Sequence, residues 1–417
     1  MKKKYPENNF VPVYWMATED HDFEEINFFN LHGKKFHWNS NQTGAGKDAV
    51  GNLITEGLEE VFQLFSAETG GTKNAEELKD LFRRSYLENS NLTEATRILA
   101  HDLFKEYGLV ILDADEARLK REFLPYLEQE LFDNISHKTT APVAEKLEDT
   151  GYEIQVNPRE INLFYLNEGL RERIIERGGT FYINETQKKF GRDELKRELE
   201  DHPERFSPNV MTRPLYQEVI LPNLCYIGGG GELAYWFELK EFFKEVEVPF
   251  PILLLRNSVL IETAKQNKKR KNLEITQAEL FLKQHELINR KVRKISNIDI
   301  DFSPQKEHLV QQFQNLYELA EKTDPSFLGA VKAQEVKQLK GLENLERRLL
   351  KAQKKKLSDE VSRIADLQNE LFPNKALQER QTNFSEMYLQ YGKSLIPELI
   401  KQLNPLDLQF CILIMED

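Results

Sequence analysis

The first half of the chain alternates short apolar runs with segments of helical periodicity. Four of these runs predict strands, and each is followed at once by polar or glycine residues: 10–16, 109–112, 223–227 and 250–255. Strands that alternate with helices are typical of a mostly parallel sheet covered by helices. We therefore expect an α/β core in which polar groups gather beyond the carboxyl ends of the strands, where such sheets bind ligands.

Apolar spacing also predicts the helices between these strands. One predicted helix precedes the second strand and carries Ile98, Leu99, Leu103, Phe104 and Tyr107 on one face. Gly108 follows it and suits the left-handed position after a helix. A second helix is predicted from the apolar spacing of Val50, Leu53, Ile54, Leu58 and Val61.

The pattern changes after Ser258 to long, charged, glycine-poor helical segments, predicted over 276–294, 304–321 and 325–371. Leu350, Leu357, Ile364 and Leu371 recur every seven positions, as in the seam of a coiled coil. A helix of that length would reach roughly 70 Å, so either a partner helix of this chain or a second subunit must cover the seam.

Three regions follow from this pattern. We expect an α/β core over 1–258, a helical coiled-coil domain over 259–372 and a segment, 373–417, that returns to the core. The last apolar run, 410–414, is expected to be a strand that rejoins the first domain.

Charge and cysteine content narrow the function. There are 57 Lys and Arg against 69 Asp and Glu, a net charge of -12, so nucleic acid is not expected as a partner. Lysines 354–356 with Arg347 and Arg348 are interpreted as the solvated face of a helix. Two distant cysteines predict neither a disulfide framework nor a zinc site, and no run is long enough for a membrane span. These features favour a cytoplasmic protein without a signal peptide.

The densest titratable cluster, 19–25, follows the first predicted strand. His21 could act as a general base or donate to a phosphate or carboxylate, with Asp20 beside it. A metal held by His21 with Asp20 or Asp22 is conceivable, but adjacent residues rarely converge on one ion and no second histidine is evident, so no metal site is predicted. Glu24 and Glu25 are interpreted as acids at the start of a helix.

Two glycine-rich segments invite comparison with phosphate loops. The segment 44–47 fails as a Walker A motif because Asn41 and Asp48 stand where the motif needs glycine and Ser or Thr. The four residues Gly228, Gly229, Gly230 and Gly231 join a predicted strand to a helix, so their N–H groups could bind an anion. A tight turn without ligand is the alternative.

The segment 206–218 combines prolines with polar groups, which suits a rigid binding loop. Asn209, Arg213, Tyr216 and Gln217 are its candidate ligand contacts. Arg213, and Arg256 at the end of the fourth strand, could each clamp a carboxylate or phosphate, although a structural salt bridge explains either arginine alone equally well. Together with His21 they predict a pocket for an anionic small molecule.

At these segments the chain resembles the cysteine-adding enzymes of bacillithiol biosynthesis, a family of cysteine ligases. The matching stretches are PVYWMATEDHDFEEIN, GLVILDADEARLKREF, PREINLFYL, FSPNVMTRPLYQEVILPNLCYIGGGGELAYWFELK and LFPNKALQER. They follow one another over nearly the whole chain. The resemblance implies a Rossmann-like core related to class I synthetases and nucleotidyltransferases, inserted connecting segments, and a coiled coil that mediates homodimerisation.

The resemblance also implies an activity: joining the carboxyl of cysteine to the amine of glucosaminyl malate, the last step in making this low-molecular-weight thiol. Amide formation from a free carboxylate needs activation, so ATP, with ADP and Mg, is expected. In that hypothesis His21 and Gly228–Gly231 contact phosphate or carboxylate, Arg213 and Arg256 hold anionic groups, and Asp20 or Asp113 orients the amine. Family members usually carry a further strand and helix with Gly-Gln-Gln and Gly-Pro-Leu-Tyr before the segment that matches here.

Two other functions fit the same residues. One is a non-catalytic dimeric scaffold that binds a nucleotide or metabolite in the core and presents its coiled coil to a partner. The other is a nucleotidyltransferase that acts on a different small substrate.

Overall fold

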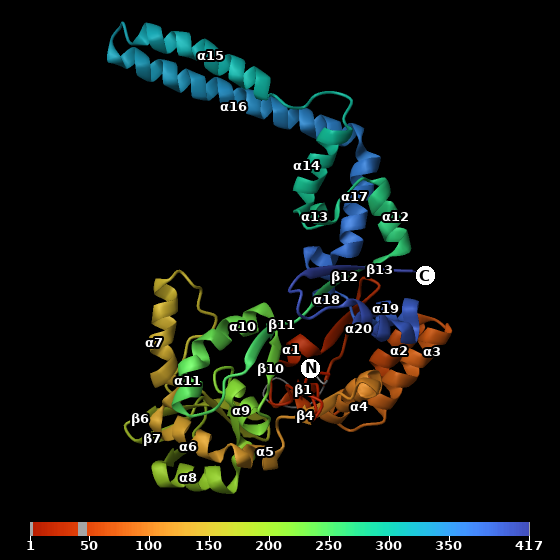
Figure 1. Ribbon diagram of the computed structural model, residues 1–417, viewed down its shortest axis with the longest axis vertical. Helices are drawn as coiled ribbons and strands as arrows, with labels where there is room; N and C mark the ends of the chain where they lie inside the picture. The colour runs from red at the N-terminus through yellow and green to blue at the C-terminus, as the bar shows by residue number, and fades with distance from the viewer. Residues whose placement is uncertain (1–2, 41–47, 417) are drawn as a thin grey trace. The chain divides into compact units, whose positions relative to one another are not determined.

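A computed structural model describes residues 3–40 and 48–416 (Figure 1). The chain forms two compact units: unit 1 contains residues 1–258 and 382–411, and unit 2 contains 259–381 and 412–417. Of the segment predicted to return to the core, the part that does so is therefore 382–411.

Two pairs of parallel strands form the α/β part of unit 1, and they confirm the four predicted strands. In the first pair β1 (Val13–Met16) runs beside β4 (Val110–Asp113), with Met16 opposite Asp113. In the second, β10 (Cys225–Gly228) runs beside β11 (Ile252–Leu255). Because both pairs are parallel, the loops after β1 and β4 lie at one shared end, and so do those after β10 and β11.

The helices of unit 1 pack around these strands (Figure 1). They are α1 Phe23–Ile26, α2 Leu58–Thr69, α3 Lys73–Phe82, α4 Leu92–Phe104, α5 Ala117–Glu122, α6 Leu124–Asp133, α7 Ile135–Asp149, α8 Arg192–Asp201, α9 Arg213–Ile220, α10 Gly230–Trp236, α11 Lys240–Glu245, α19 Phe384–Tyr391 and α20 Leu395–Gln402. The helix predicted before β4 is confirmed, and Gly108 adopts φ +69° in the left-handed region after it.

The helix predicted over 50–61 is wrong in its first half. A short 3-10 turn covers Val50–Asn52, and α2 begins only at Leu58. Ile54 pairs with Asn91 in an isolated β-bridge, and Gly57 adopts φ +86°, so the backbone between them is not helical. The glycine-rich segment 44–47 lies outside the described residues.

An antiparallel sheet of five strands is the largest in unit 1, and the sequence analysis missed it. Its order is β8-β7-β6-β5-β9, with bounds β5 Leu163–Asn167, β6 Leu170–Arg177, β7 Thr180–Ile183, β8 Lys189–Gly191 and β9 Phe206–Pro208. A small hairpin, β2 (Phe28–Leu31) and β3 (Lys34–His37), follows α1. The α/β core thus carries a substantial antiparallel insertion.

One continuous apolar core joins the antiparallel sheet to both parallel pairs. Trp236, Tyr165, Tyr216 and Phe206 are almost entirely buried in it, and Trp15 of β1 and Leu253 of β11 pack against it. The rings of Tyr216 and Trp15 meet edge to face at 5.2 Å between centroids. Such aromatic burial is the main stabilising contribution to a core of this size.

Unit 2 is mainly helical, and its elements are β12 Ser258–Thr263, α12 Ala264–Asn272, α13 Gln277–Leu280, α14 Gln284–Ile295, α15 Ser303–Ala320, α16 Pro325–Lys356, α17 Ser358–Leu371, α18 Gln378–Gln381 and β13 Phe410–Met415. The side chain of Asp324 accepts from the N–H of Ser326 and caps α16. The single helix predicted over 325–371 is broken at Leu357, where ψ is 35°.

The predicted heptad seam is covered within the chain. Ile364 and Leu371 belong to a buried cluster with Leu280 and Leu287 of α13 and α14. Leu350 packs with Val292 and Ile300 in another cluster. The partner of this seam is therefore a set of short helices from the same chain.

The final strand also differs from its prediction. Residues 410–415 do form a strand, β13, but it pairs with β12 and not with a strand of the α/β core. Among the described residues, no helix combines the length and the apolar character needed to cross a membrane.

Candidate active site at the end of the first strand pair

The loop that follows β1 is held firmly by hydrogen bonds. The Thr18 hydroxyl donates to Asp113 at the end of β4, at 2.5 Å. The carbonyl of Thr18 accepts from Gly51 N–H at 2.9 Å, and that of Asp20 accepts from Val50 N–H at 2.6 Å. The loop that carries the predicted titratable cluster therefore has a fixed backbone, as a preorganised site requires.

A buried charge cluster lies under this loop. The Lys120 ammonium is 2.6 Å from Glu19 and 2.5 Å from Asp115, and it donates to the Glu204 carbonyl at 3.0 Å. Burial acts to lower the pKa of Lys120, but the two carboxylates outweigh it and raise that pKa. Burial raises the pKa of Asp115 to about 6, although Lys120 opposes this effect. These groups anchor Glu19, the neighbour of Asp20.

His21 meets an arginine from the antiparallel sheet. One terminal nitrogen of Arg171, in β6, is 2.8 Å from His21 Nδ1. A guanidinium can only donate, so Nδ1 accepts and the proton of neutral imidazole lies on Nε2. In this arrangement His21 presents a hydrogen-bond donor at Nε2. That geometry favours the predicted donor role over the predicted general-base role.

Arg171 is itself buried, with 8% of its surface exposed. Its guanidinium lies over the ring of Phe164, 3.8 Å from the centroid. Its Nε–H has no hydrogen-bond partner among the described residues. A buried guanidinium with an unused donor is costly unless a ligand pairs with it, so this arginine is a candidate anion contact.

Asp20 stays ionised beside these groups. Burial acts to raise the pKa of Asp20, but the N–H of His21 and the charges of Arg213 and Arg171 together lower it. The same carboxylate is 3.5 Å from His21 Nδ1, and Asp22 is 3.8 Å from that atom on the other side. Two carboxylates, an imidazole and two guanidinium groups therefore share one small region.

Arg213 reaches this region from the first residue of α9. Its charge acts on Asp20, on Arg171 and on the hydroxyls of Tyr226 and Tyr235. Among the described residues, no carboxylate oxygen lies within 4.0 Å of the Arg213 guanidinium, the limit for an ion pair. The side chain is thus held near the site without a salt bridge that would use up its charge.

The other ligand contacts predicted in the segment 206–218 are turned toward the protein interior. Asn209 accepts from the N–H of Met211 and donates to Asn162, at 2.8 and 3.0 Å. Tyr216 is fully buried and donates to the Ala114 carbonyl at 2.8 Å, while Gln217 is 9% exposed. The side chains of Asn209 and Tyr216 are thus engaged inside the protein, and the Asn209 carbonyl accepts from the Arg213 N–H at 2.8 Å.

The second strand pair presents the glycine turn and Arg256. Gly228 ends β10, Gly230 begins α10, and the N–H of Arg256 donates to the Gly228 carbonyl at 2.9 Å. The Gly229 N–H donates to the carboxylate of Glu232 at 2.7 Å. The chain's own acid therefore occupies one of the N–H donors predicted to meet an anion, and Gly230 and Gly231 form the start of α10.

Asp20, His21 and Asp22 also place one potential ligand atom each within 4.8 Å of one another. This is the metal arrangement that the sequence analysis considered and set aside. Arg171 donates to His21 Nδ1 at this point, and a guanidinium cation repels a metal ion that would need the same lone pair.

The structure thus brings together Asp20, His21, Asp22 and Arg213, joins Asp113 to them through Thr18, and leaves the glycines and Arg256 at the other strand pair. The residue that sequence reasoning missed is Arg171. Only the turns of its sheet left a signal in the sequence: Gly169 and the pair Gly178 and Gly179 adopt positive φ between β5, β6 and β7, and the apolar runs 163–166 and 181–183 flank them.

The fold and site define a Rossmann-like protein with an attached helical domain. Residues 1–257 match the family model described as the N-terminal Rossmann-like domain of bacillithiol biosynthesis BshC, and 259–415 match its C-terminal coiled-coil domain. The chain belongs to the BshC family.

Relatives agree over almost the whole chain. Proteins named "Putative cysteine ligase BshC" are 66% identical in Christiangramia forsetii, 58% in Flavobacterium johnsoniae and 38% in Cytophaga hutchinsonii, each over 413 residues. These alignments cover 99% of this chain and 77%, 77% and 76% of the three relatives.

Proposed function

We propose that this chain is a ligase that joins the carboxyl of cysteine to the amine of glucosaminyl malate. The family and the names of its relatives support a cysteine ligase of bacillithiol biosynthesis. The observation that carries the substrate assignment is Arg171, a buried guanidinium with a free Nε–H beside His21, Asp20 and Arg213. Glucosaminyl malate bears carboxylates for the cations and an amine for the acid.

Each group then has a distinct task. Arg171 and Arg213 bind the malate carboxylates, and the Nε2–H of His21 donates to an oxygen on which negative charge develops. Asp20, kept ionised by its neighbours, accepts from the substrate amine and orients it toward the carboxyl of cysteine. Asp113 acts through Thr18 by holding the loop in place.

The reaction also needs an energy source, because an amide does not form from a free carboxylate in water without activation. We propose ATP as the co-substrate: the cysteine carboxylate is phosphorylated or adenylated by ATP, and the amine then displaces that phosphate or AMP as the amide bond forms. The phosphates of ATP are anions of the kind that Arg256 could bind, and Asp22, whose side chain is 53% exposed, could contact an accompanying Mg²⁺.

The test is an assay of purified protein with cysteine, glucosaminyl malate and ATP, in which mass spectrometry detects the amide product. We expect product with the unmodified chain and at least about 100-fold less with Arg171→Gln, since a lost charged contact in a water-excluded site costs this much. Arg118→Gln is the matched control, because that side chain is 81% exposed. Equal loss in both variants would contradict the assignment.

We also propose a homodimer, formed through a surface other than the heptad seam. Exposed apolar side chains remain on α15 and α16: Leu316, Leu319, Phe327, Leu328, Val336 and Leu345. Light scattering should show that Val336→Asp yields monomers. Leu357→Asp, which changes a residue packed within the chain, should lower stability but leave the dimer intact. Dimers of Val336→Asp would refute this surface.

A further inference from the structure

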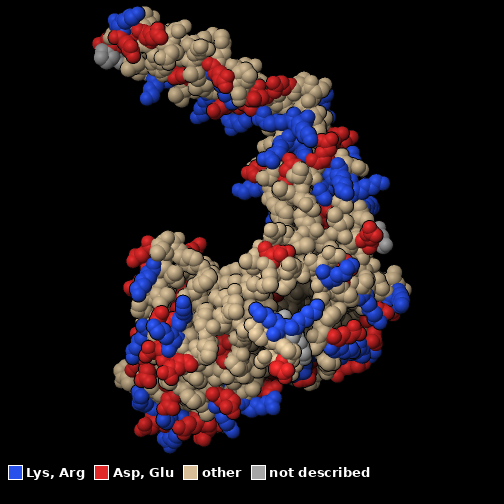
Figure 2. Space-filling model, in the orientation of Figure 1, with Lys and Arg blue, Asp and Glu red and all other residues tan. Residues whose placement is uncertain are grey.

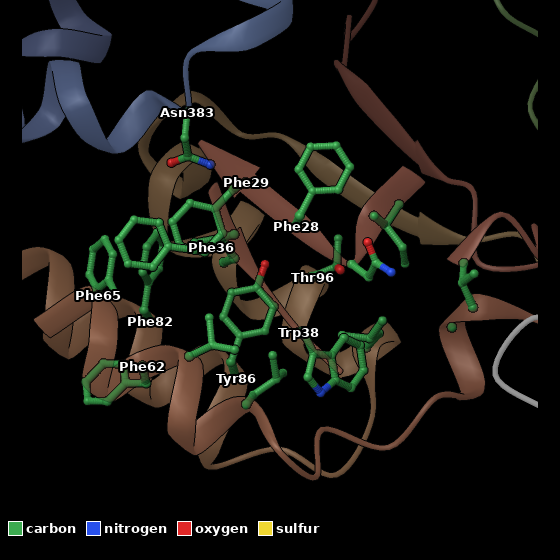
Figure 3. Close-up of a pocket in the computed structure, with 18 of the residues that line it drawn as sticks. Phe28, Phe29, Phe36, Trp38, Phe62, Phe65, Phe82, Tyr86, Thr96 and Asn383 are labelled. Atoms are coloured by element: carbon green, nitrogen blue, oxygen red, sulfur yellow. The ribbon is translucent and has the colours of Figure 1, made fainter. Parts of the chain in front are cut away.

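A cavity of about 350 Å³ lies in unit 1, separate from the charged groups described above. It is walled by β1, by the β2–β3 hairpin, by α2 and α4, and by the start of α19 (Figure 3). Its volume falls within the range of small-molecule sites, which are concave and mostly apolar with a few polar groups.

The walls are aromatic and fixed by contacts among themselves. Phe29 stacks on Phe36 at 5.1 Å between centroids, and Phe65 meets Phe82 at 5.0 Å. Figure 3 shows these rings arranged around the open space together with Trp38. Rings that are locked by their neighbours cannot collapse into the cavity, so its shape is preformed.

Several polar residues line this apolar surface, Thr18, Thr96 and Asn383 among them, and two others define what a ligand must offer. Asn27 lines the cavity, is 2% exposed, and has an Oδ1 atom without a hydrogen-bond partner among the described residues. The Tyr86 hydroxyl points into the space (Figure 3), and burial raises the pKa of that hydroxyl to about 12. A buried carbonyl oxygen left unpaired is costly, which suggests that a ligand donor normally meets it.

Charge on the lining is the remaining property that defines the ligand. Among the described residues that line the cavity, none is Asp, Glu, Lys or Arg. An ionic ligand would therefore lose its hydration without gaining a counter-charge.

We propose that this cavity binds an uncharged planar ring compound, aromatic or heteroaromatic, whose N–H donates to Asn27 Oδ1. The flat rings of the wall supply the stacking surface, and the Tyr86 hydroxyl serves an acceptor on the ligand when one is present. This ligand is distinct from the anionic substrates of the charged site.

Its position links the cavity to the charged loop. Thr18 and Gly51 line the cavity, and the Gly51 N–H donates to the Thr18 carbonyl. A Cβ on Gly51 would lie 2.7 Å from the Thr18 Cβ and 2.4 Å from the Thr93 hydroxyl. The backbone at Gly51 is therefore in close contact with both threonines. An occupant therefore presses on the same backbone that positions Asp20 and Asp113.

Calorimetry on the full chain tests the proposal with two probes, indole and 1-methylindole. Both are flat and neutral, but only indole carries an N–H. We expect saturable one-to-one binding of indole, at least about fivefold tighter than that of 1-methylindole because the methylated ring leaves Asn27 Oδ1 unpaired. Absence of saturable binding, or equal affinity for the two probes, would overturn the proposal.

Two variants assign the binding to this cavity. Val61→Phe fills the space and should abolish indole binding, whereas Val11→Phe makes the same change at an exposed position outside the lining and should not. Asn27→Leu keeps the rings and should bring the ratio of the two affinities close to one. Indole binding that survives Val61→Phe, or a ratio unchanged in Asn27→Leu, would place the ligand elsewhere.

Discussion

The ends of the two parallel strand pairs look alike in sequence and differ in structure. After β1 and β4, a guanidinium from a separate sheet approaches the loop and keeps one N–H unused. After β10, the carboxylate of Glu232 takes the Gly229 N–H, and the turn is closed by its own helix. An anion can therefore bind at a strand end only where the protein's own carboxylates have not already paired with the donors there.

The largest expected effect separates the two ends directly. Arg171→Gln should reduce ligase turnover by at least about 100-fold, because it removes a buried charge from the reacting groups. Arg256→Gln should cost less than about tenfold, since Arg256 is exposed and water screens its contact with a phosphate. Steady-state rates measure both, with circular dichroism to confirm folding. A greater loss in Arg256→Gln would reverse the comparison.

Two amide substitutions test whether His21 acts as a hydrogen-bond donor or as a general base. In His21→Gln the side-chain N–H reaches the position of Nε2, while in His21→Asn it does not. If His21 donates through Nε2, His21→Gln should retain about tenfold more activity than His21→Asn. A general base would be lost equally in both variants, so equal rates would contradict the donor assignment.

The first strand end should respond to mild acid through the buried carboxyl of Asp115. Burial raises the pKa of Asp115 from 3.8 to about 6. The native state then binds more protons than the unfolded chain between these values, so this group's contribution to the free energy of unfolding falls as pH rises through that window. The change is on the order of 3 kcal/mol at most.

Urea denaturation at pH 4 and pH 7 measures this effect when the unmodified protein is compared with Asp115→Asn. The amide of that variant does not titrate between these pH values. The fall in stability attributable to Asp115 should disappear in that variant and persist in the control Asp22→Asn, whose side chain is 53% exposed. An identical pH dependence in Asp115→Asn and the unmodified protein would show that Asp115 is not the group responsible.

The smallest effect concerns the second strand end. Glu232→Gln weakens the acid that caps α10 and should lower the free energy of unfolding by about 0.5–1 kcal/mol, with little change in ligase rate. Thermal denaturation measures the free energy of unfolding, and the mass-spectrometric ligase assay measures the rate. A large loss of activity would mean that this turn, and not the loop after β1, contacts the reacting groups.

The parallel strands and most helices could be predicted from sequence because their periodicity is local. The apolar runs of β1, β4, β10 and β11 are bounded by sharp polar or glycine signals. The break of the last long helix at Leu357 could not be predicted, since the heptad spacing continues across it and residues on both sides of it, Leu350 and Val361, pack in one cluster with Val292 of α14.

The candidate site also contains some residues that could be predicted from the sequence and others that could not. His21, Asp20 and Arg213 could be named because titratable groups after strands suggest a site. Arg171 could not, because it follows His21 by 150 residues and only the folded antiparallel sheet brings the two together. For Tyr216 and Asn209 the sequence shows polarity, whereas their hydrogen bonds inside the protein depend on tertiary structure.

Residues 382–411 have a practical consequence for dissecting this chain. They bring α19 back to α3, where the Asn74 side chain donates to the Leu389 carbonyl at 3.1 Å. The helical unit is accordingly an insertion tethered at both ends, and a fragment cut after residue 258 would lack two helices of its own fold. A separable catalytic half would require excising 259–381 and bridging the gap with a short linker.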